Sequence, residues 1–241
     1  MTDKWKDIWN GRDTDMASIR DGADEFAVYS RLKEMDGFDV AVGDRKAYYS
    51  SFYHVALELW QRMIERLDIQ SVYEIGCGSG ANLYLLKNRG IKVGGLDYSE
   101  KLAGAAQEIL GKEGNFISVG EAADLATEEK WDVLFCCSVF EYFPDAGYGL
   151  KVLEKMYEKA TKAVIVLEVF DKALQEECEQ HRRKTIDNYD EKYKGLGKTF
   201  YTRDMFMQFA QERHSRIEFT EVDNPYYWNS RYQYNCILYK D

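Results

Sequence analysis

The sequence predicts an α/β protein with a doubly wound open sheet, and three observations support this fold class. Strand-like and helical stretches alternate from residue 71 onward, as in sheets covered by helices on both faces. The runs at 133–137 and 163–167 are continuously apolar, which is typical of parallel strands buried on both sides. The run at 71–75 leads into three glycines at every second position and then into a helical stretch. That succession predicts a nucleotide-binding turn.

Residues 1–70 precede this turn and are predicted to form a helical cap or lid. A first helix would carry Trp5 and Trp9 on one face, and a second would occupy 26–35. The stretch 48–67 has apolar residues at helical spacing and predicts a long amphipathic helix.

Residues 71–241 are predicted to form the core, in which elements follow one another in a regular order. Strands are expected at 71–76, 91–96, 115–119, 132–137 and 163–169, with helices at 81–89, 99–111, 121–126 and 146–160. The charged, tyrosine-rich stretch 171–202 is expected to be an inserted segment on the acceptor side, followed by a helix at 203–213. Two closing strands, at 216–222 and 232–239, suit an antiparallel hairpin on the sheet edge.

The composition excludes several classes of protein. Of the 241 residues 45% are hydrophobic, and the formal net charge of −10 argues against a nucleic-acid partner, which needs Lys and Arg for phosphate contacts. No apolar run approaches membrane-spanning length, so we expect no membrane partner and a cytoplasmic location. Five cysteines without a CxxC pair and three scattered histidines predict no metal site. A monomer or a homodimer is expected.

The glycine loop allows two interpretations. Gly76-x-Gly78-x-x-Ala81 fits the dinucleotide fingerprint, and this pattern alone does not distinguish the ligand. Glu74, two residues before the first glycine, and the additional Gly80 point elsewhere. A carboxylate at this position suits a cationic ligand and repels a pyrophosphate.

The pattern Glu74-x-Gly76-x-Gly78-x-Gly80 resembles motif I of the class I S-adenosylmethionine (SAM)-dependent methyltransferases. The resemblance implies a mostly parallel, seven-stranded, Rossmann-like sheet whose last strand is antiparallel. It also implies SAM as the cofactor and S-adenosyl-L-homocysteine (SAH) as its product. The loop would then lie beside the amino acid half of SAM, which carries an ammonium group. The cofactor-binding residues implied here are Glu74, Gly76, Cys77, Gly78, Gly80 and Asn82.

Two further stretches match later motifs of this family, at the expected places after the glycine loop. Asp97 ends the second strand, 21 positions after Gly76, where a carboxylate can accept hydrogen bonds from ribose hydroxyls. Asp97 as a helix N-cap is the alternative, although Ser99 is able to fill that role alone. The resemblance further implies that Tyr98 flanks the adenine and that Glu121, with the Ala122 amide, reads the adenine edge.

The stretch after the fourth strand resembles the corresponding motif of small-molecule methyltransferases. Carbonyls near Cys137 and Ser138 would bind the methionyl ammonium, and Glu141 and Tyr142 would face the acceptor. The (Asp/Asn)-Pro-Pro-(Tyr/Phe) motif of amino-methylating DNA enzymes is missing at this site. Its nearest counterpart, at 224–227, is interpreted as a turn between the closing strands.

The remaining candidates concern the acceptor. Methyl transfer from SAM requires alignment of the nucleophile and, for a hydroxyl acceptor, removal of its proton. Glu141 and His54 are the expected catalytic residues, and Glu168 and His181 are further candidate bases. His54 as a packed surface residue and His181 as a solvated one are the alternatives. The expected substrate-binding residues are Tyr142, Glu168, Tyr201 and Tyr227.

The sequence thus predicts a methyltransferase that moves a methyl group from SAM to an oxygen or nitrogen of a small molecule. A metabolite, a natural product or a sugar would serve as the acceptor. The alternatives are an NAD-dependent oxidoreductase, a methyltransferase with a protein acceptor, and a non-catalytic SAM-binding subunit.

Overall fold

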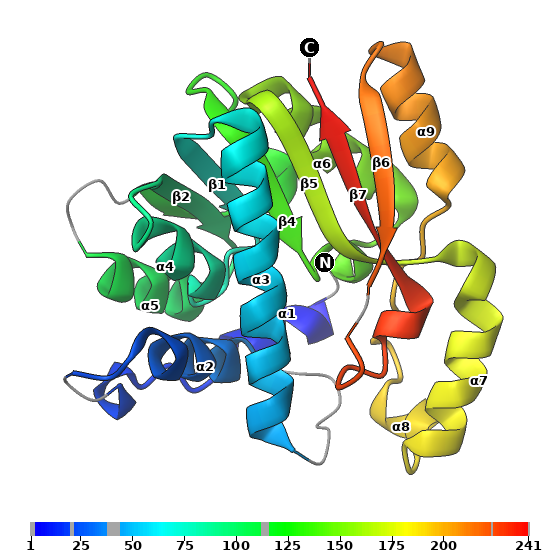
Figure 1. Ribbon diagram of the computed structural model, residues 1–241. Coiled ribbons are helices and arrows are strands. Elements are labelled where there is room, and N and C mark those ends of the chain that lie inside the picture. Colours follow the sequence, from blue (N-terminus) through cyan, green and yellow to red (C-terminus); the bar gives the residue numbers. More distant parts are fainter. Residues whose placement is uncertain (1–2, 20–21, 38–43, 112–115, 223, 241) are drawn as a thin grey trace.

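The centre of the protein is a seven-stranded sheet, seen in a computed structural model that describes residues 3–19, 22–37, 44–111, 116–222 and 224–240 (Figure 1). The strand order is β3-β2-β1-β4-β5-β7-β6. The strands are β1 (Ser71–Ile75), β2 (Lys92–Asp97), β3 (Phe116–Val119), β4 (Trp131–Cys137), β5 (Ala160–Phe170), β6 (Arg216–Glu221) and β7 (Gln233–Tyr239). Strands β1 to β5 pair in parallel, and β7 runs antiparallel between β5 and β6. The predicted doubly wound sheet with an antiparallel last strand is confirmed.

Helices cover both faces of this sheet, which explains the continuously apolar strands. In β4, Val133 and Phe135 face the side covered by α4 (Ala81–Lys87), whereas Leu134 and Cys136 face α6 (Ala146–Lys159). The remaining core helices are α5 (Glu100–Leu110) and α9 (Arg203–Glu212), with short 3-10 turns η2 (Ala122–Asp124) and η3 (Phe140–Tyr142). The prediction of a helix at 121–126 was wrong, because only the turn η2 forms there. So short a stretch does not offset the cost of helix nucleation.

The N-terminal segment forms α1 (Asp3–Asn10), η1 (Met16–Ser18), α2 (Glu25–Asp36) and α3 (Arg45–Leu67). Figure 1 shows α1 and α2 below the carboxyl ends of the parallel strands, while α3 extends from there up across the sheet. In the upper half of α3 the Trp60 ring packs edge-on against Phe135, with centroids 4.9 Å apart. Because α3 joins both regions, the division of the chain at residue 70 remains a prediction.

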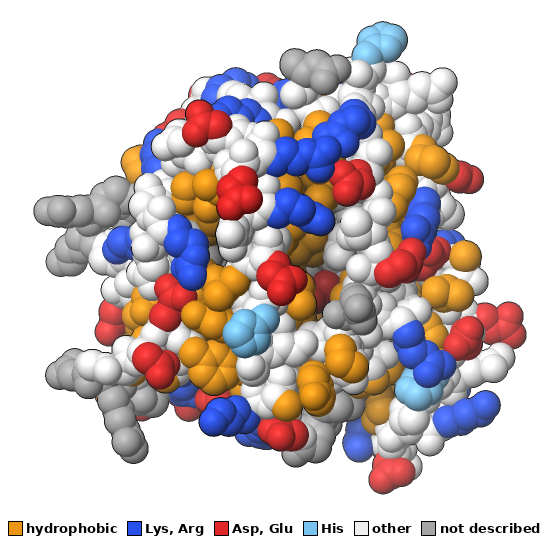
Figure 2. Space-filling view, viewed as in Figure 1, with side chains coloured by type: hydrophobic (Ala, Val, Ile, Leu, Met, Phe, Trp, Pro, Cys, Tyr) orange, Lys and Arg blue, Asp and Glu red, His pale blue; other side chains and the backbone are white. Residues whose placement is uncertain are grey.

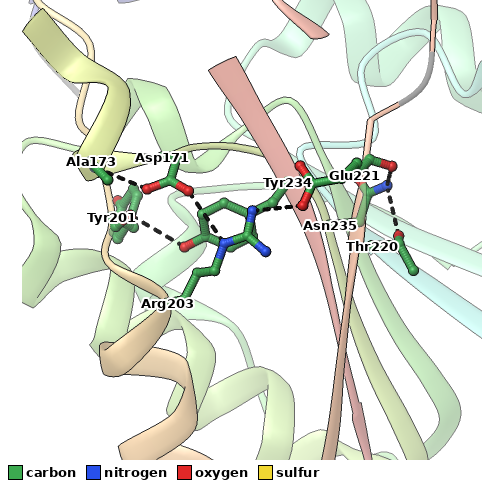
Figure 3. Close-up of polar contacts among 8 residues, drawn as sticks. All are labelled: Asp171, Ala173, Tyr201, Arg203, Thr220, Glu221, Tyr234 and Asn235. Carbon is green, nitrogen blue, oxygen red and sulfur yellow. Dashed lines mark hydrogen bonds and ion pairs between the residues drawn. The ribbon is translucent and has the colours of Figure 1, made fainter. Parts of the chain in front are cut away.

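The segment between β5 and α9 contains η4 (Lys172–Leu174), α7 (Gln175–Thr185) and α8 (Tyr189–Lys192), and η5 (Ser230–Tyr232) precedes β7. Its two ends are tied to the closing strands (Figure 3). The Arg203 guanidinium lies 3.3 Å from Asp171 Oδ2 and 3.0 Å from Glu221 Oε1. Tyr234 Oη donates to the Tyr201 carbonyl at 3.3 Å. The inserted segment is therefore fastened to β6 and β7 at both of its ends.

Among the described residues, no helix is long and apolar enough to cross a membrane. All five cysteines are described, and none forms a disulfide.

Candidate active site

A cavity lies at the carboxyl edge of the parallel strands, where ligands bind in open α/β sheets. Its floor is formed by the loop after β1 and by the ends of β2, β4 and β5. Its roof is formed by Asp36 of α2, Phe52 of α3 and Tyr227 of the 224–229 loop. The cavity thus joins the core to the N-terminal helices.

The glycine loop forms one wall, and it requires glycine at two positions. Gly76 and Gly78 have φ angles of +67° and +53°, which favour glycine. A Cβ on Gly76 would lie 2.4 Å from Val139 Cγ2, and one on Gly78 would lie 2.4 Å from Asp36 Oδ1. Gly80 does not line the cavity but begins α4 close to Ala106 of α5. Gly76, Cys77 and Gly78 are therefore the predicted loop residues that face the cavity.

Glu74 lies at the end of β1 with only 2% of its surface exposed. Its Oε1 accepts a hydrogen bond from Asn82 Nδ2 at 2.9 Å, so the start of α4 orients the carboxyl group. Oε2 is buried and has no hydrogen-bond partner among the described residues. Burial raises the pKa of Glu74 to about 8 from its ordinary value of 4.5, although the Asn82 hydrogen bond opposes this rise. A cationic ligand would satisfy the second oxygen.

Asp97 ends β2 and accepts two backbone hydrogen bonds, from Gly78 N and Ser99 N, each at 2.8 Å. Burial raises its pKa to about 6 in spite of these bonds. The α5 cap is Ser99, whose hydroxyl accepts from Leu102 N at 3.4 Å. Because Ser99 caps the helix, Asp97 is not needed there and faces the cavity beside Tyr98.

Glu121 and Ala122 line a smaller pocket that shares Gly76, Asp97 and Tyr98 with the main cavity. The Glu121 carboxylate forms an ion pair with Lys6 of α1 at 2.5 Å. The smaller pocket thus adjoins the main cavity near the carboxyl ends of β1, β2 and β3.

Cys137, Ser138 and Glu168 line the cavity where β4 and β5 end. The Ser138 hydroxyl donates a hydrogen bond to Glu168 Oε2. Burial raises the pKa of Glu168, while the Ser138 hydrogen bond and the charges of Lys33 and Lys198 act in the opposite direction.

Glu141 and Tyr142 also line the cavity, in the turn after β4. The Glu141 side chain is 1% exposed, and its Oε1 lies 3.6 Å from Lys198 Nζ, which is itself 5% exposed. The ring of Tyr142 packs edge-on against Trp5 and Trp9 of α1, at centroid distances of 4.7 and 5.3 Å. These contacts join α1 and the inserted segment to the turn after β4.

Two lining residues of α2, Asp36 and Lys33, were missed by sequence reasoning. Asp36 Oδ1 accepts a hydrogen bond from Ser79 N at 2.7 Å, and the Ser79 hydroxyl donates to the Leu32 carbonyl at 2.8 Å. In the sequence, Asp36 and Gly37 only mark the end of a helix. Their position at the glycine loop depends on the path of the chain between distant segments.

Three candidates lie outside the cavity. His54 is exposed on α3 beside Tyr53, and His181 lies against Trp228. Tyr201 is buried in the core, where its hydroxyl donates to the Phe140 carbonyl at 2.9 Å. Tyr227 does line the cavity, and its hydroxyl accepts from Asn229 Nδ2 at 3.0 Å. The structure therefore brings Tyr142, Glu168 and Tyr227 together, without His54, His181 or Tyr201.

The fold and this site define the class of protein. Class I methyltransferases have this strand order. They also have a glycine loop next to a buried carboxylate and an acidic residue at the end of the second strand, as Glu74 and Asp97 are here. A family model described as a methyltransferase domain matches residues 73–164. The chain therefore carries a class I SAM-dependent methyltransferase domain, and the protein is a SAM-dependent methyltransferase.

Comparison with solved structures finds the same fold over most of the chain. Magnesium protoporphyrin IX methyltransferase from Synechocystis PCC 6803, with bound SAH, is 17% identical, with a TM-score of 0.63 over 88% of this chain and 93% of that one. CalS10, an amino pentose methyltransferase from Micromonospora echinaspora with bound SAM, is 12% identical, with a TM-score of 0.61 over 89% and 97%. The plantazolicin methyltransferase BpumL is 13% identical, with a TM-score of 0.61 over 90% and 96%. A search among curated proteins found no match.

The residues present fit SAM. The unpartnered Oε2 of buried Glu74 suits an ammonium group, and the two glycines leave space that a Cβ would fill. Each Asp97 oxygen accepts one backbone hydrogen bond and can accept a second one, so the residue fits a ligand with hydroxyl groups. Among the described residues, no group of three or more His, Cys, Asp and Glu side chains is arranged to hold a metal ion.

Proposed function

We propose that the protein methylates an oxygen or nitrogen of a small molecule, such as a metabolite, a natural product or a sugar. The observation that supports this proposal is the roof over the acceptor end of the cavity. There Phe52 and Tyr227 belong to one aromatic cluster, with ring centroids 5.4 Å apart. An aromatic roof of this kind offers apolar faces to a small acceptor and excludes water from the reacting groups.

SAM supplies an electrophilic methyl group: the acceptor's lone pair bonds to the methyl carbon while the carbon–sulfur electrons remain on sulfur, giving SAH. The residues of this chain bind and orient the reactants. At the glycine loop, Glu74 would bind the cationic group of the ligand and Asp97 its hydroxyl groups. Glu141, in the turn after β4, and Glu168, near the end of β5, would face the acceptor. We propose these assignments as the roles of the predicted site residues.

The three similar structures support a small acceptor. Their names describe enzymes that act on magnesium protoporphyrin IX, an amino pentose and plantazolicin. A nucleic-acid acceptor is disfavoured by the net charge of −10. On the face shown in Figure 2, Lys and Arg side chains alternate with Asp and Glu, without a continuous basic patch among the residues described.

Two measurements test the proposal. Calorimetry with SAM, SAH and NAD is expected to detect binding of the first two only. Incubation of a cell extract with methyl-labelled SAM and the enzyme is expected to label the small-molecule fraction. Label confined to protein would favour the second candidate, a protein acceptor, and would overturn the small-molecule assignment.

We also propose a cytoplasmic enzyme that acts as a monomer or homodimer. The five free cysteines, of which four are buried, agree with a reducing compartment.

A further inference from the structure

Two neighbouring residues at the carboxyl edge of the sheet have strained backbones. Ser138 follows β4 with a φ angle of +53°, and Glu168 lies in β5 with a φ angle of +60°. Neither is a glycine, and a side chain makes this backbone region unfavourable. Their side chains meet, because the Ser138 hydroxyl donates to Glu168 Oε2 at the cavity wall. Strain of this kind persists only where surrounding contacts hold it, and it concentrates at functional sites.

The strain at Glu168 is held by β7. Asn235 Oδ1 accepts a hydrogen bond from Glu168 N at 3.0 Å, and Gln233 Nε2 donates to the Glu168 carbonyl at 3.1 Å. The pairing of β5 with β7 shifts register between Val166 and Val169, which gives the backbone its irregular turn. Asn235 also donates to Thr220 Oγ1 at 3.3 Å (Figure 3). The closing strands thus aim the Glu168 carboxyl group into the cavity.

Glu168 differs from Glu141, the other carboxyl group on this side. Glu141 directs Oε1 to Lys198, with both side chains at least 95% buried, so a fixed countercharge compensates its charge. Glu168 instead accepts a hydrogen bond from the neutral hydroxyl group of Ser138. A carboxylate stabilised by a neutral donor remains more basic than one paired with an ammonium group at close range.

We propose that Glu168 is the catalytic residue that receives the acceptor's proton, and that the acceptor presents a hydroxyl or an amine rather than a carboxylate. This inference rests on the proposed function. The lone pair of the acceptor's oxygen or nitrogen forms the new bond to the methyl carbon. The O–H or N–H bond of the same atom breaks: its electrons stay on the oxygen or nitrogen, and the proton passes to Glu168. A carboxylate acceptor needs no base and would bring a second negative charge beside Glu168.

The charged and titratable groups around Glu168 come from several elements of the fold. Lys33 of α2 and Lys198 of the inserted segment favour its ionised form. The other groups that interact with its charge are Tyr29 of α2, Tyr48 of α3, Cys137 of β4 and Tyr227. Burial raises the pKa of each of these four groups, so all of them are neutral near pH 7. Burial raises the pKa of Glu168 and outweighs the opposing charges of the two lysines, so the carboxylate is a stronger base than an exposed glutamate.

The first test uses methyl-labelled SAM with the small-molecule fraction of a cell extract. Mild alkali releases label from methyl esters as methanol but leaves methyl ethers and methylamines intact. We expect alkali-stable label, and we expect Glu168→Gln to lower the initial rate at least about 100-fold, the usual range for a lost general base. Its Kd for SAM, measured by calorimetry, should stay within threefold of wild type, which also shows that the variant folds. The exposed Glu58→Gln is the matched control and should keep the full rate.

The second test follows the titration. Ser138→Ala removes a hydrogen bond that favours the ionised form, so the acidic limb of the pH–rate profile should move to higher pH. The Glu168 carboxyl resonance, identified by its loss in Glu168→Gln, should move likewise in ¹³C NMR. Alkali-labile label, an unchanged rate in Glu168→Gln, or an unmoved titration in Ser138→Ala would overturn the inference. Wild type that binds SAM but labels no small molecule would instead overturn the proposed function, and this inference with it.

Discussion

Glu74 shows how a single buried carboxyl group can be prepared for a cation. Asn82 holds one of its oxygens, and the other has no partner among the residues described. Burial raises its pKa to about 8, so near pH 7 the group is largely protonated without ligand. A cation that binds to the carboxylate form must therefore displace a proton.

Replacing Glu74 by Gln should remove this proton release. We expect SAM affinity to fall about 10- to 100-fold, because a hydrogen bond to a charged group contributes about 1.5–3 kcal/mol. Calorimetry at pH 7 in buffers of different ionisation enthalpy should detect proton release with wild type only. Equal proton release by the variant would show that another group is responsible.

The same substitution should change the pH dependence of folding. The folded protein holds the Glu74 proton up to about pH 8, whereas the unfolded chain loses it near its ordinary pKa of 4.5. Between these values the folded state binds more protons, so the free energy of unfolding falls as pH rises. Denaturant titrations of the unliganded protein should show that Glu74→Gln is less sensitive to pH in this window. A slope as steep as that of wild type would contradict this assignment.

Gly78 controls how α2 meets the glycine loop. In Gly78→Ala, the new Cβ would approach Asp36 Oδ1 at a φ angle of +53°, so we expect a loss of about 1–3 kcal/mol in unfolding free energy and weaker SAM binding. Gly104→Ala is the matched control, since its Cβ meets nothing within 4 Å inside α5. This control should gain about 0.5–1 kcal/mol. Thermal denaturation measures both variants, and a Gly78→Ala protein as stable as Gly104→Ala would contradict this prediction.

At the scale of elements, α3 serves both the sheet and the cavity. Its first half carries Phe52 over the cavity, and its second half buries Trp60 and Met63 against the sheet. The second half of α3 therefore packs against the core, while Phe52 in its first half reaches the cavity. In contrast to α3, the 171–202 segment contributes no residue to the lining of the main cavity. It contacts the lining residue Glu141 instead: Lys198 pairs with the Glu141 carboxyl group, and Thr199 N donates to the Glu141 carbonyl at 2.9 Å.

Trp60→Ala tests the structural role of α3. Removal of this buried ring should lower the free energy of unfolding by about 3–5 kcal/mol, because it leaves a cavity between the helix and Phe135. Val55→Ala on the exposed face of the same helix should change it by less than about 0.5 kcal/mol. Denaturant unfolding measures both, and a Trp60→Ala midpoint equal to that of wild type would mean that α3 is a lid that separates from the core.

At the scale of the whole molecule, the carboxyl edge of the sheet gathers segments from all parts of the chain. Residues of α1 and α2, of the 224–229 loop and of the inserted segment lie close to the site residues at the ends of β4 and β5. Binding of SAM should therefore stabilise the N-terminal helices together with the glycine loop.

Hydrogen exchange measures this coupling. At a SAM concentration of 100 times Kd, binding raises the free energy of unfolding by about 2.7 kcal/mol. Hydrogen exchange that requires unfolding should then slow up to about 100-fold. We expect exchange to slow most in α2 and at Ser79 N, which donates to Asp36, and least in α9, on the other face of the sheet. Protection of β1 and β2 without α2 would show that α2 does not cover the cofactor.

The sequence alone determined the class of fold and the cofactor-facing loop, because both depend on local patterns. Apolar runs specify buried strands, and the spacing of Glu74, Gly76 and Gly78 after such a run specifies a tight turn. Element ends agreed within three residues, apart from the turn η2 in place of a helix.

Only the tertiary structure decided which side chains meet in the cavity. It brought Asp36 to Ser79, joined Glu141 to Lys198, and left His54 and Tyr201 outside. The strain at Glu168 also depends on β7, where the Gln233 side chain donates to the backbone of a strand 65 residues earlier. These contacts join segments far apart in the chain, and their geometry follows from packing across the sheet, which no local pattern encodes.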